Sequence, residues 1–181
     1  MFSKTSDAMS ASDLIEKELL YHGDMIQFGV PEGWGKIHHW AIYMGDGQII
    51  HHTTHDNSFA FSQNSPNSKC RCVGIYEDSL VEYAKNQLVR KHNWADNGYQ
   101  ITYGIWPFLS YKHVYPTVRN PYDIVEVADE YYKGIRKIGT YHGLSNNCEI
   151  FATLCRYDVE KGFTGQTLGH GLRNSLWDPH P

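Results

Sequence analysis

Apolar and polar residues alternate in two runs of the first third of the chain, a pattern typical of strands. Residues 24–28 form the first run, and residues 39–44 and 48–51 form the second on either side of a break. The break at residues 45–47 reads Gly-Asp-Gly, and Asp-Gly chemistry favours tight hairpin turns. The pattern therefore predicts a strand at 24–28 and an antiparallel hairpin over 39–51.

Helical spacing and capping residues predict helices elsewhere. Asn120 followed by Pro121 is a favourable helix start, because proline fits the first helical position. Ser79 with Glu82 forms a capping box. The predicted helices cover residues 13–20, 79–91, 120–133 and 147–157.

Together these predicted elements indicate an α+β fold, in which an antiparallel sheet packs against helices. We expect a further strand at 70–76 and short strands and loops across the aromatic-rich stretch 93–118. A length of 181 residues suits one domain. We assign residues 1–12 to a flexible leader, 13–159 to the domain and 160–181 to an irregular tail.

Composition narrows the class of protein. Sixteen Lys and Arg against 20 Asp and Glu give a net charge of -4, so we expect no nucleic-acid partner. No run of about 18 apolar residues is present, which argues against a transmembrane helix. The polar start of the chain is not a secretory signal peptide, and four cysteines are too few for a disulfide framework. These features together favour a cytoplasmic protein.

One cysteine is placed where a thiol becomes reactive. A thiolate is the nucleophile, and a helix amino terminus favours negative charge. Cys148 follows Ser145, Asn146 and Asn147 and opens the last predicted helix, whereas Cys155 lies two turns deeper on its apolar face. Cys148 is therefore the candidate nucleophile, and Cys155 is expected to be an inert core thiol.

Two histidines across the hairpin turn are candidates to activate that thiol. His39 and His51 lie on paired strands, roughly opposite or diagonal to each other. One imidazole could take the thiol proton while the other orients it. His38 and His52 are the alternatives, since a one-residue slip exchanges the faces of a strand. A zinc site at His51, His52 and His55 lacks an acidic ligand beside it, and we expect no metal.

Two motifs in this order resemble a known family. Residues 23–28 and 39–51 look like the histidine box of the lecithin:retinol acyltransferase-like family, and residues 145–151 (SNNCEIF) look like its Asn-Cys box. The resemblance spans residues 20–159. It implies the circularly permuted papain-like fold of the broader NlpC/P60 group. It also implies a cysteine acyl-enzyme without a cofactor, with Cys148 as nucleophile, His39 as general base and His51 as the orienting residue.

The resemblance implies a thiol-dependent acyltransferase or phospholipase A-type hydrolase. Its substrate would be a phospholipid or another acyl-lipid, with possible peripheral membrane contact. Two other functions stay open. An NlpC/P60-like peptidase or amidase would use the same thiol, and a catalytically silent interaction protein would use only the scaffold. Ile150 stands where the family usually has histidine, which motivates the silent alternative.

Overall fold

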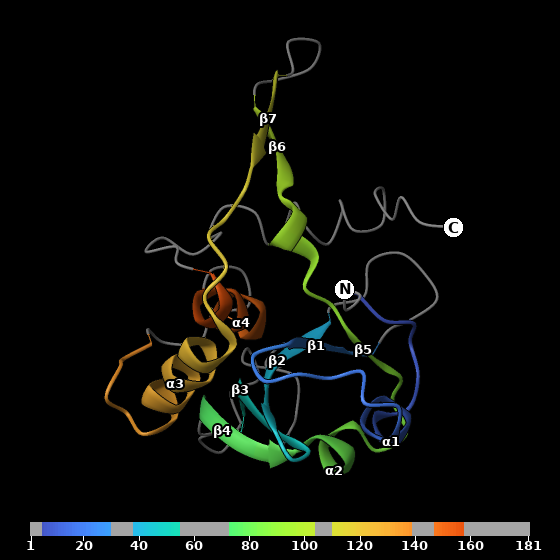
Figure 1. Ribbon diagram of the computed structural model, residues 1–181. Coiled ribbons are helices and arrows are strands. Elements are labelled where there is room, and N and C mark those ends of the chain that lie inside the picture. Colours follow the sequence, from blue (N-terminus) through green and yellow to red (C-terminus); the bar gives the residue numbers. More distant parts are fainter. Residues whose placement is uncertain (1–4, 30–37, 55–72, 104–109, 139–146, 158–181) are drawn as a thin grey trace, which may run out of the picture.

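The computed structural model describes residues 5–29, 38–54, 73–103, 110–138 and 147–157, and its centre is an antiparallel sheet (Figure 1). The strands lie in the order β4-β3-β2-β1-β5, and every neighbouring pair is antiparallel. Their bounds are β1 Met25–Phe28, β2 His39–Gly45, β3 Gln48–Thr54, β4 Val73–Ser79 and β5 Val89–Lys91. The expected α+β class with an antiparallel sheet is confirmed.

The β2–β3 hairpin forms around the predicted turn. Asp46 and Gly47 adopt φ values of 49° and 75°, the left-handed region that Asp-Gly turns supply at low cost. Gly45 adopts a φ of 101°, which favours glycine, and a Cβ there would lie 2.1 Å from Nε2 of His22. The hairpin therefore fixes its register through backbone chemistry that is visible in the sequence.

Helices cover both faces of the sheet. Helices α1 (Ala11–Glu16) and α2 (Leu80–Ala84) pack on one face, and α3 (Pro121–Tyr132) and α4 (Cys148–Arg156) pack on the other (Figure 1). Alternation along the strands divides their residues between the two cores. The core under α1 and α2 includes Phe28, Ala41, Tyr43 and Ile49. The core under α3 and α4 includes Met25, Trp40, Ile42, Ile50, Cys148 and Phe151.

Two helices differ from the prediction, α1 at both ends, since it covers Ala11–Glu16 and not 13–20, and α2 at its end. Helix α1 begins at Ala11, because the Ser10 side chain accepts a hydrogen bond from the Asp13 backbone N–H and caps the helix. The helix expected over 79–91 is correct at its start but wrong in its second half, since α2 ends at Ala84. Lys85 adopts a φ of 50°, and the following residues form β5 against β1. Strand pairing with β1 overrides local helix preference here.

The first described residues lie against the sheet. Met9 forms an antiparallel bridge with Val89 of β5, and the Ser6 backbone N–H donates to the Lys91 carbonyl at 3.1 Å. Residues 5–12 of the expected leader therefore pair with β5 or enter α1. The expected tail, residues 160–181, lies outside the described residues.

The aromatic-rich stretch forms short elements, as expected. A 3₁₀ turn at Trp94–Asn97 precedes a second sheet of two strands, β6 (Tyr99–Tyr103) and β7 (Ser110–Val114). This hairpin extends away from the main sheet (Figure 1). No helix among the described residues has both the length and the apolar character needed to span a bilayer.

Candidate active site

Cys148 occupies the first turn of α4, as the sequence predicts. The Asn147 side chain caps the helix by accepting a hydrogen bond from the Ile150 backbone N–H at 3.1 Å. The Cys148 thiol is buried and lies 3.8 Å from the carbonyl oxygen of His38, to which its S–H can donate. The positive end of the helix dipole therefore acts on this sulfur. The next residue, Glu149, has a pKa that burial raises to about 7.

His39 and His51 form a direct hydrogen-bonded pair. Nε2 of His39 lies 2.6 Å from Nδ1 of His51, and the ring centroids are 4.9 Å apart. Ile42 pairs with Ile50 in the register, so His51 is diagonal to His39 across the hairpin. The expectation that these two rings share a face is confirmed. His52 follows on the opposite face of β3 because strand side chains alternate.

The Cys148 thiol and the His39 ring have different packing neighbours near the start of β2. Cys148 belongs to the core under α4, with Trp40 and Ile42. The ring of His39 packs instead near Phe28, at a centroid distance of 5.6 Å. The sulfur lies against the backbone of His38, and His39 is the next residue.

Tyr83 of α2 lies against both imidazoles, and sequence reasoning missed it. Its ring is 4.4 Å from that of His51 and 5.2 Å from that of His39 between centroids. Burial raises the pKa of Tyr83 to about 12, and a hydrogen bond with Thr53 opposes that rise. The charge of a Cys148 thiolate would also raise this pKa. An aromatic side chain of the short helix α2 thus packs against both imidazoles.

Asp78 of β4 completes a chain of three polar side chains. Its Oδ2 lies 2.9 Å from Nε2 of His51, whose other ring nitrogen contacts His39. The His51 side chain is fully buried, whereas 42% of the Asp78 side chain is exposed. Sequence reasoning did not find this residue, since it is 27 positions away and lies on another strand. The only available signal was a carboxylate directly before the Ser79 helix cap.

Both imidazoles of the pair are uncharged at neutral pH. Burial lowers the pKa of His39 well below 6.5, and the neighbouring His51 and His52 rings lower it further. Burial also lowers the pKa of His51, although Asp78 opposes that effect. A neutral imidazole can accept a proton, as a general base must.

The alternative histidines and cysteines lie elsewhere or in different environments. The His38 ring hydrogen-bonds to the backbone of Phe28 and Gly29. Burial lowers the pKa of His52 to about 4. Cys155 is fully buried, and burial raises the pKa of its thiol, in agreement with an inert core role. Cys70, Cys72 and His55 lie outside the described residues, and within the described part no His, Cys, Asp or Glu group is arranged to hold a metal ion.

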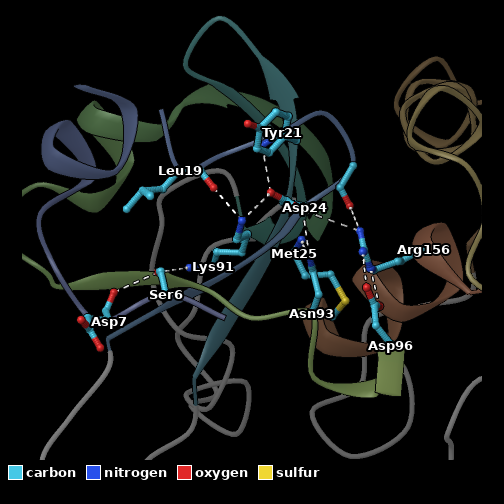
Figure 2. A network of polar contacts seen from close by, with 11 residues as sticks. Ser6, Asp7, Leu19, Tyr21, Asp24, Met25, Lys91, Asn93, Asp96 and Arg156 are labelled. Carbon is cyan, nitrogen blue, oxygen red and sulfur yellow. Dashed lines mark hydrogen bonds and ion pairs between the residues drawn. The ribbon is translucent and has the colours of Figure 1, made fainter. Parts of the chain in front are cut away.

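Helix α4 is anchored at its far end by a buried ionic network (Figure 2). Arg156 donates two hydrogen bonds to Asp96, at 2.9 and 2.6 Å, and a third to the Gly23 carbonyl at 2.7 Å. Asp24 lies 3.9 Å from the same guanidinium and accepts from Asn93 at 2.7 Å. A guanidinium at a helix carboxyl terminus also complements the dipole. The network therefore fixes α4 against the start of β1 and holds its axis in place.

Comparison with known proteins gives three findings. The family model described as lecithin retinol acyltransferase matches residues 18–161. Phospholipase A and acyltransferase 1 of Rattus norvegicus is 30% identical over 135 residues, which cover 75% of this chain and 66% of that protein. Gamma-D-glutamyl-L-lysine dipeptidyl-peptidase of Bacillus cereus (strain ATCC 10987 / NRS 248) is 49% identical over 37 residues, 20% of this chain and 11% of that protein.

Proposed function

The chain belongs to the lecithin retinol acyltransferase family, and from this membership we propose that it is a thiol-dependent acyltransferase or phospholipase A-type hydrolase acting on lipid acyl groups. The observation that carries the proposal is the position of the hydrogen-bonded His39–His51 pair. His39 begins β2, and the carbonyl oxygen of the residue before it, His38, contacts the Cys148 thiol. A thiol and a neutral base that can take its proton are the two groups that covalent cysteine chemistry requires.

The first chemical step forms a thioester. His39 takes the proton from Cys148, and the sulfur attacks the ester carbonyl carbon of the acyl-lipid. The resulting oxyanion lies near the first turn of α4, where backbone N–H groups point away from the helix. When the intermediate collapses, the carbon–oxygen bond breaks, and the alcohol leaves with the proton that His39 carried.

The second step releases the acyl group. An incoming water, amine or hydroxyl gives its proton to His39 as it attacks the thioester carbonyl, and the sulfur leaves. His51 holds the His39 ring through the Nε2 to Nδ1 contact in both steps. Water would make the protein a hydrolase, and an amine or hydroxyl would make it an acyltransferase.

Family membership and the order of histidine before cysteine also support a circularly permuted papain-like fold of the NlpC/P60 group. The antiparallel sheet with α4 packed against β2 agrees with this proposal. Peripheral contact with a membrane follows from the proposed lipid substrate.

An acyl-loading assay tests the proposal. Incubation with phospholipid vesicles of one defined acyl chain should add the mass of that chain to the protein, as measured by intact mass spectrometry. Cys148→Ala should lose the adduct, whereas the matched variant Cys155→Ala should keep it. No adduct and no released fatty acid across several acyl donors would contradict the proposal and favour a silent interaction protein.

A peptidase or amidase is the second candidate, supported by the 37-residue match to the dipeptidyl-peptidase. The same thiol would then attack an amide carbonyl. This candidate would be favoured over the first if the protein cleaves members of a peptide and isopeptide panel but does not turn over lipids. Cys148→Ala should abolish that cleavage.

A further inference from the structure

Asp78 is a charged group in direct contact with the imidazole pair. It lies near the end of β4, paired in register with Ile49 of β3, and its Oδ2 contacts His51 Nε2 at 2.9 Å. On the other side of that ring, Nδ1 contacts His39 Nε2 at 2.6 Å. We propose that Asp78 is a positioning residue that sets the tautomers of both imidazoles and so selects Nδ1 of His39 as the atom that accepts the thiol proton.

The assignment follows from counting protons. A carboxylate can only accept hydrogen bonds, so Nε2 of His51 must carry a hydrogen and donate it to Asp78. A neutral imidazole has one N–H, and His51 is neutral because burial lowers its pKa. Its Nδ1 is therefore bare. The contact at 2.6 Å then needs a hydrogen from His39, which must sit on Nε2.

The opposite arrangement is excluded by the carboxylate. If His51 donated from Nδ1 to His39, its bare Nε2 would face Asp78 with two lone pairs opposed at 2.9 Å. Without Asp78, nothing in the pair itself distinguishes the two arrangements. The Asp78 carboxylate, acting through His51, thus determines that Nδ1 of His39 carries no hydrogen.

The position of Asp78 also suits the charge that forms during the reaction. Proton transfer turns His39 into an imidazolium, and a carboxylate on the same hydrogen-bonded chain stabilises that positive charge. The Asp78 side chain is 42% exposed, so water also reaches its carboxyl group. Among the described residues, the Tyr83 ring from α2 packs against both imidazoles, and the charge of a protonated His52 from β3 would act on His39. Both Tyr83 and His52 stay neutral near pH 7.

This inference rests on the proposed function but is tested first without catalysis. Long-range ¹⁵N–¹H NMR on protein labelled at the histidine ring nitrogens reports which nitrogen carries the hydrogen. In the wild type at pH 7.5, His39 and His51 should each show a protonated Nε2 and a bare Nδ1. In Asp78→Asn, the amide can accept from or donate to His51, so both rings should shift together toward averaged tautomers.

Glu77→Gln is the matched control, since Glu77 is the adjacent, exposed carboxylate and lies on the other face of β4. It should leave both ring spectra unchanged. If Asp78→Asn and Asp78→Ala, each shown to fold by circular dichroism, keep the wild-type tautomers, the proposal is wrong.

Acyl-loading kinetics then separate this inference from the proposed function. Asp78→Asn should lower kcat about tenfold or more with little change in KM, because proton transfer is affected and lipid binding is not. A wild type that is inert toward every acyl donor, yet shows the tautomer shift in Asp78→Asn, would overturn the proposed function alone. An unchanged kcat together with unchanged tautomers would overturn the role of Asp78 alone.

Discussion

His39 and His51 are joined nitrogen to nitrogen at 2.6 Å, and burial keeps both rings uncharged at neutral pH. A pair of neutral rings can hold one fixed hydrogen between them, whereas two charged rings would repel each other. The burial that lowers these pKa values therefore keeps the rings unprotonated, which both the contact between them and the proposed role of His39 as proton acceptor require.

The lowered pKa of His39 predicts where the rate of acyl transfer should fall as the pH decreases. If neutral His39 is the base, acyl transfer should fall only when that ring becomes protonated, so the limb should lie below pH 6.5. The measurement is kcat/KM for acyl transfer from pH 4 to pH 9. An acid limb centred at or above pH 6.5 would contradict this assignment of the base.

The same burial predicts loss of stability in acid, and His92 offers a clean test. Burial lowers its pKa to about 3, and its ring packs edge-on against Trp40. The unfolded chain takes up a proton near pH 6.5 while the folded chain does not, so stability falls as the pH drops below 6.5. His92→Phe keeps an aromatic ring against Trp40 but cannot titrate. The free energy of unfolding of this variant, measured in urea relative to wild type, should be roughly 1–2 kcal/mol higher at pH 5 than at pH 7.5. An equal pH dependence in both proteins would refute the explanation.

Glu149 should change the pH dependence of folding stability in the opposite direction to His92. Burial raises its pKa to about 7, so between pH 4.5 and 7 the folded chain holds a proton that the unfolded chain releases. Its contribution to stability is complete below pH 4.5 and is lost as the pH rises through 7. Glu149→Gln should therefore raise Tm at pH 8 by roughly 3 °C, on the order of 1 kcal/mol, and change it little at pH 4. Thermal unfolding at the two pH values measures the difference, and an equal shift at both would count against it.

Removal of Arg156 should be costly because it leaves buried carboxylates without their partner. Arg156→Met breaks the contacts to Asp96 and Asp24, and we expect a loss of about 3–5 kcal/mol in urea unfolding. The exposed pair of Arg136 and Glu130 provides the control, for which Arg136→Met should cost under about 1 kcal/mol. Adding Asp96→Asn to Arg156→Met should recover part of the loss. Similar costs for the two arginines would show that the network does not anchor α4.

The two described cysteines should differ in reactivity. Iodoacetamide at pH 7.5 should alkylate Cys148 much faster than Cys155, whose thiol pKa is raised by burial. Peptide mapping after short exposure measures both rates. Equal rates would favour a scaffold without an activated thiol.

Local chemistry explains which parts of the fold could be predicted. The β2–β3 hairpin and the starts of α3 and α4 follow from Asp46-Gly47, Asn120-Pro121 and Asn147, whose effects act within a few residues. The end of α2 could not be predicted, because it depends on β5 pairing with β1 some sixty positions away. Short-range signals were thus sufficient wherever a turn or a cap decided the structure.

Some residues of the candidate site could be predicted from the sequence, and others could not. His39, His51 and Cys148 were identified because each belongs to a recognisable motif. Asp78 and Tyr83 were missed because their roles exist only through contacts between β3, β4 and α2. Sequence patterns can place a reactive group on its element, but they do not give the neighbours that define its protonation.

The order of the elements along the chain has a consequence for synthesis. All five strands of the main sheet, together with Asp78 and Tyr83, precede Cys148. As a ribosome makes this protein, the basic half of the site can assemble before the sulfur emerges. Cys148 therefore joins a sheet whose strands have all been synthesised before it.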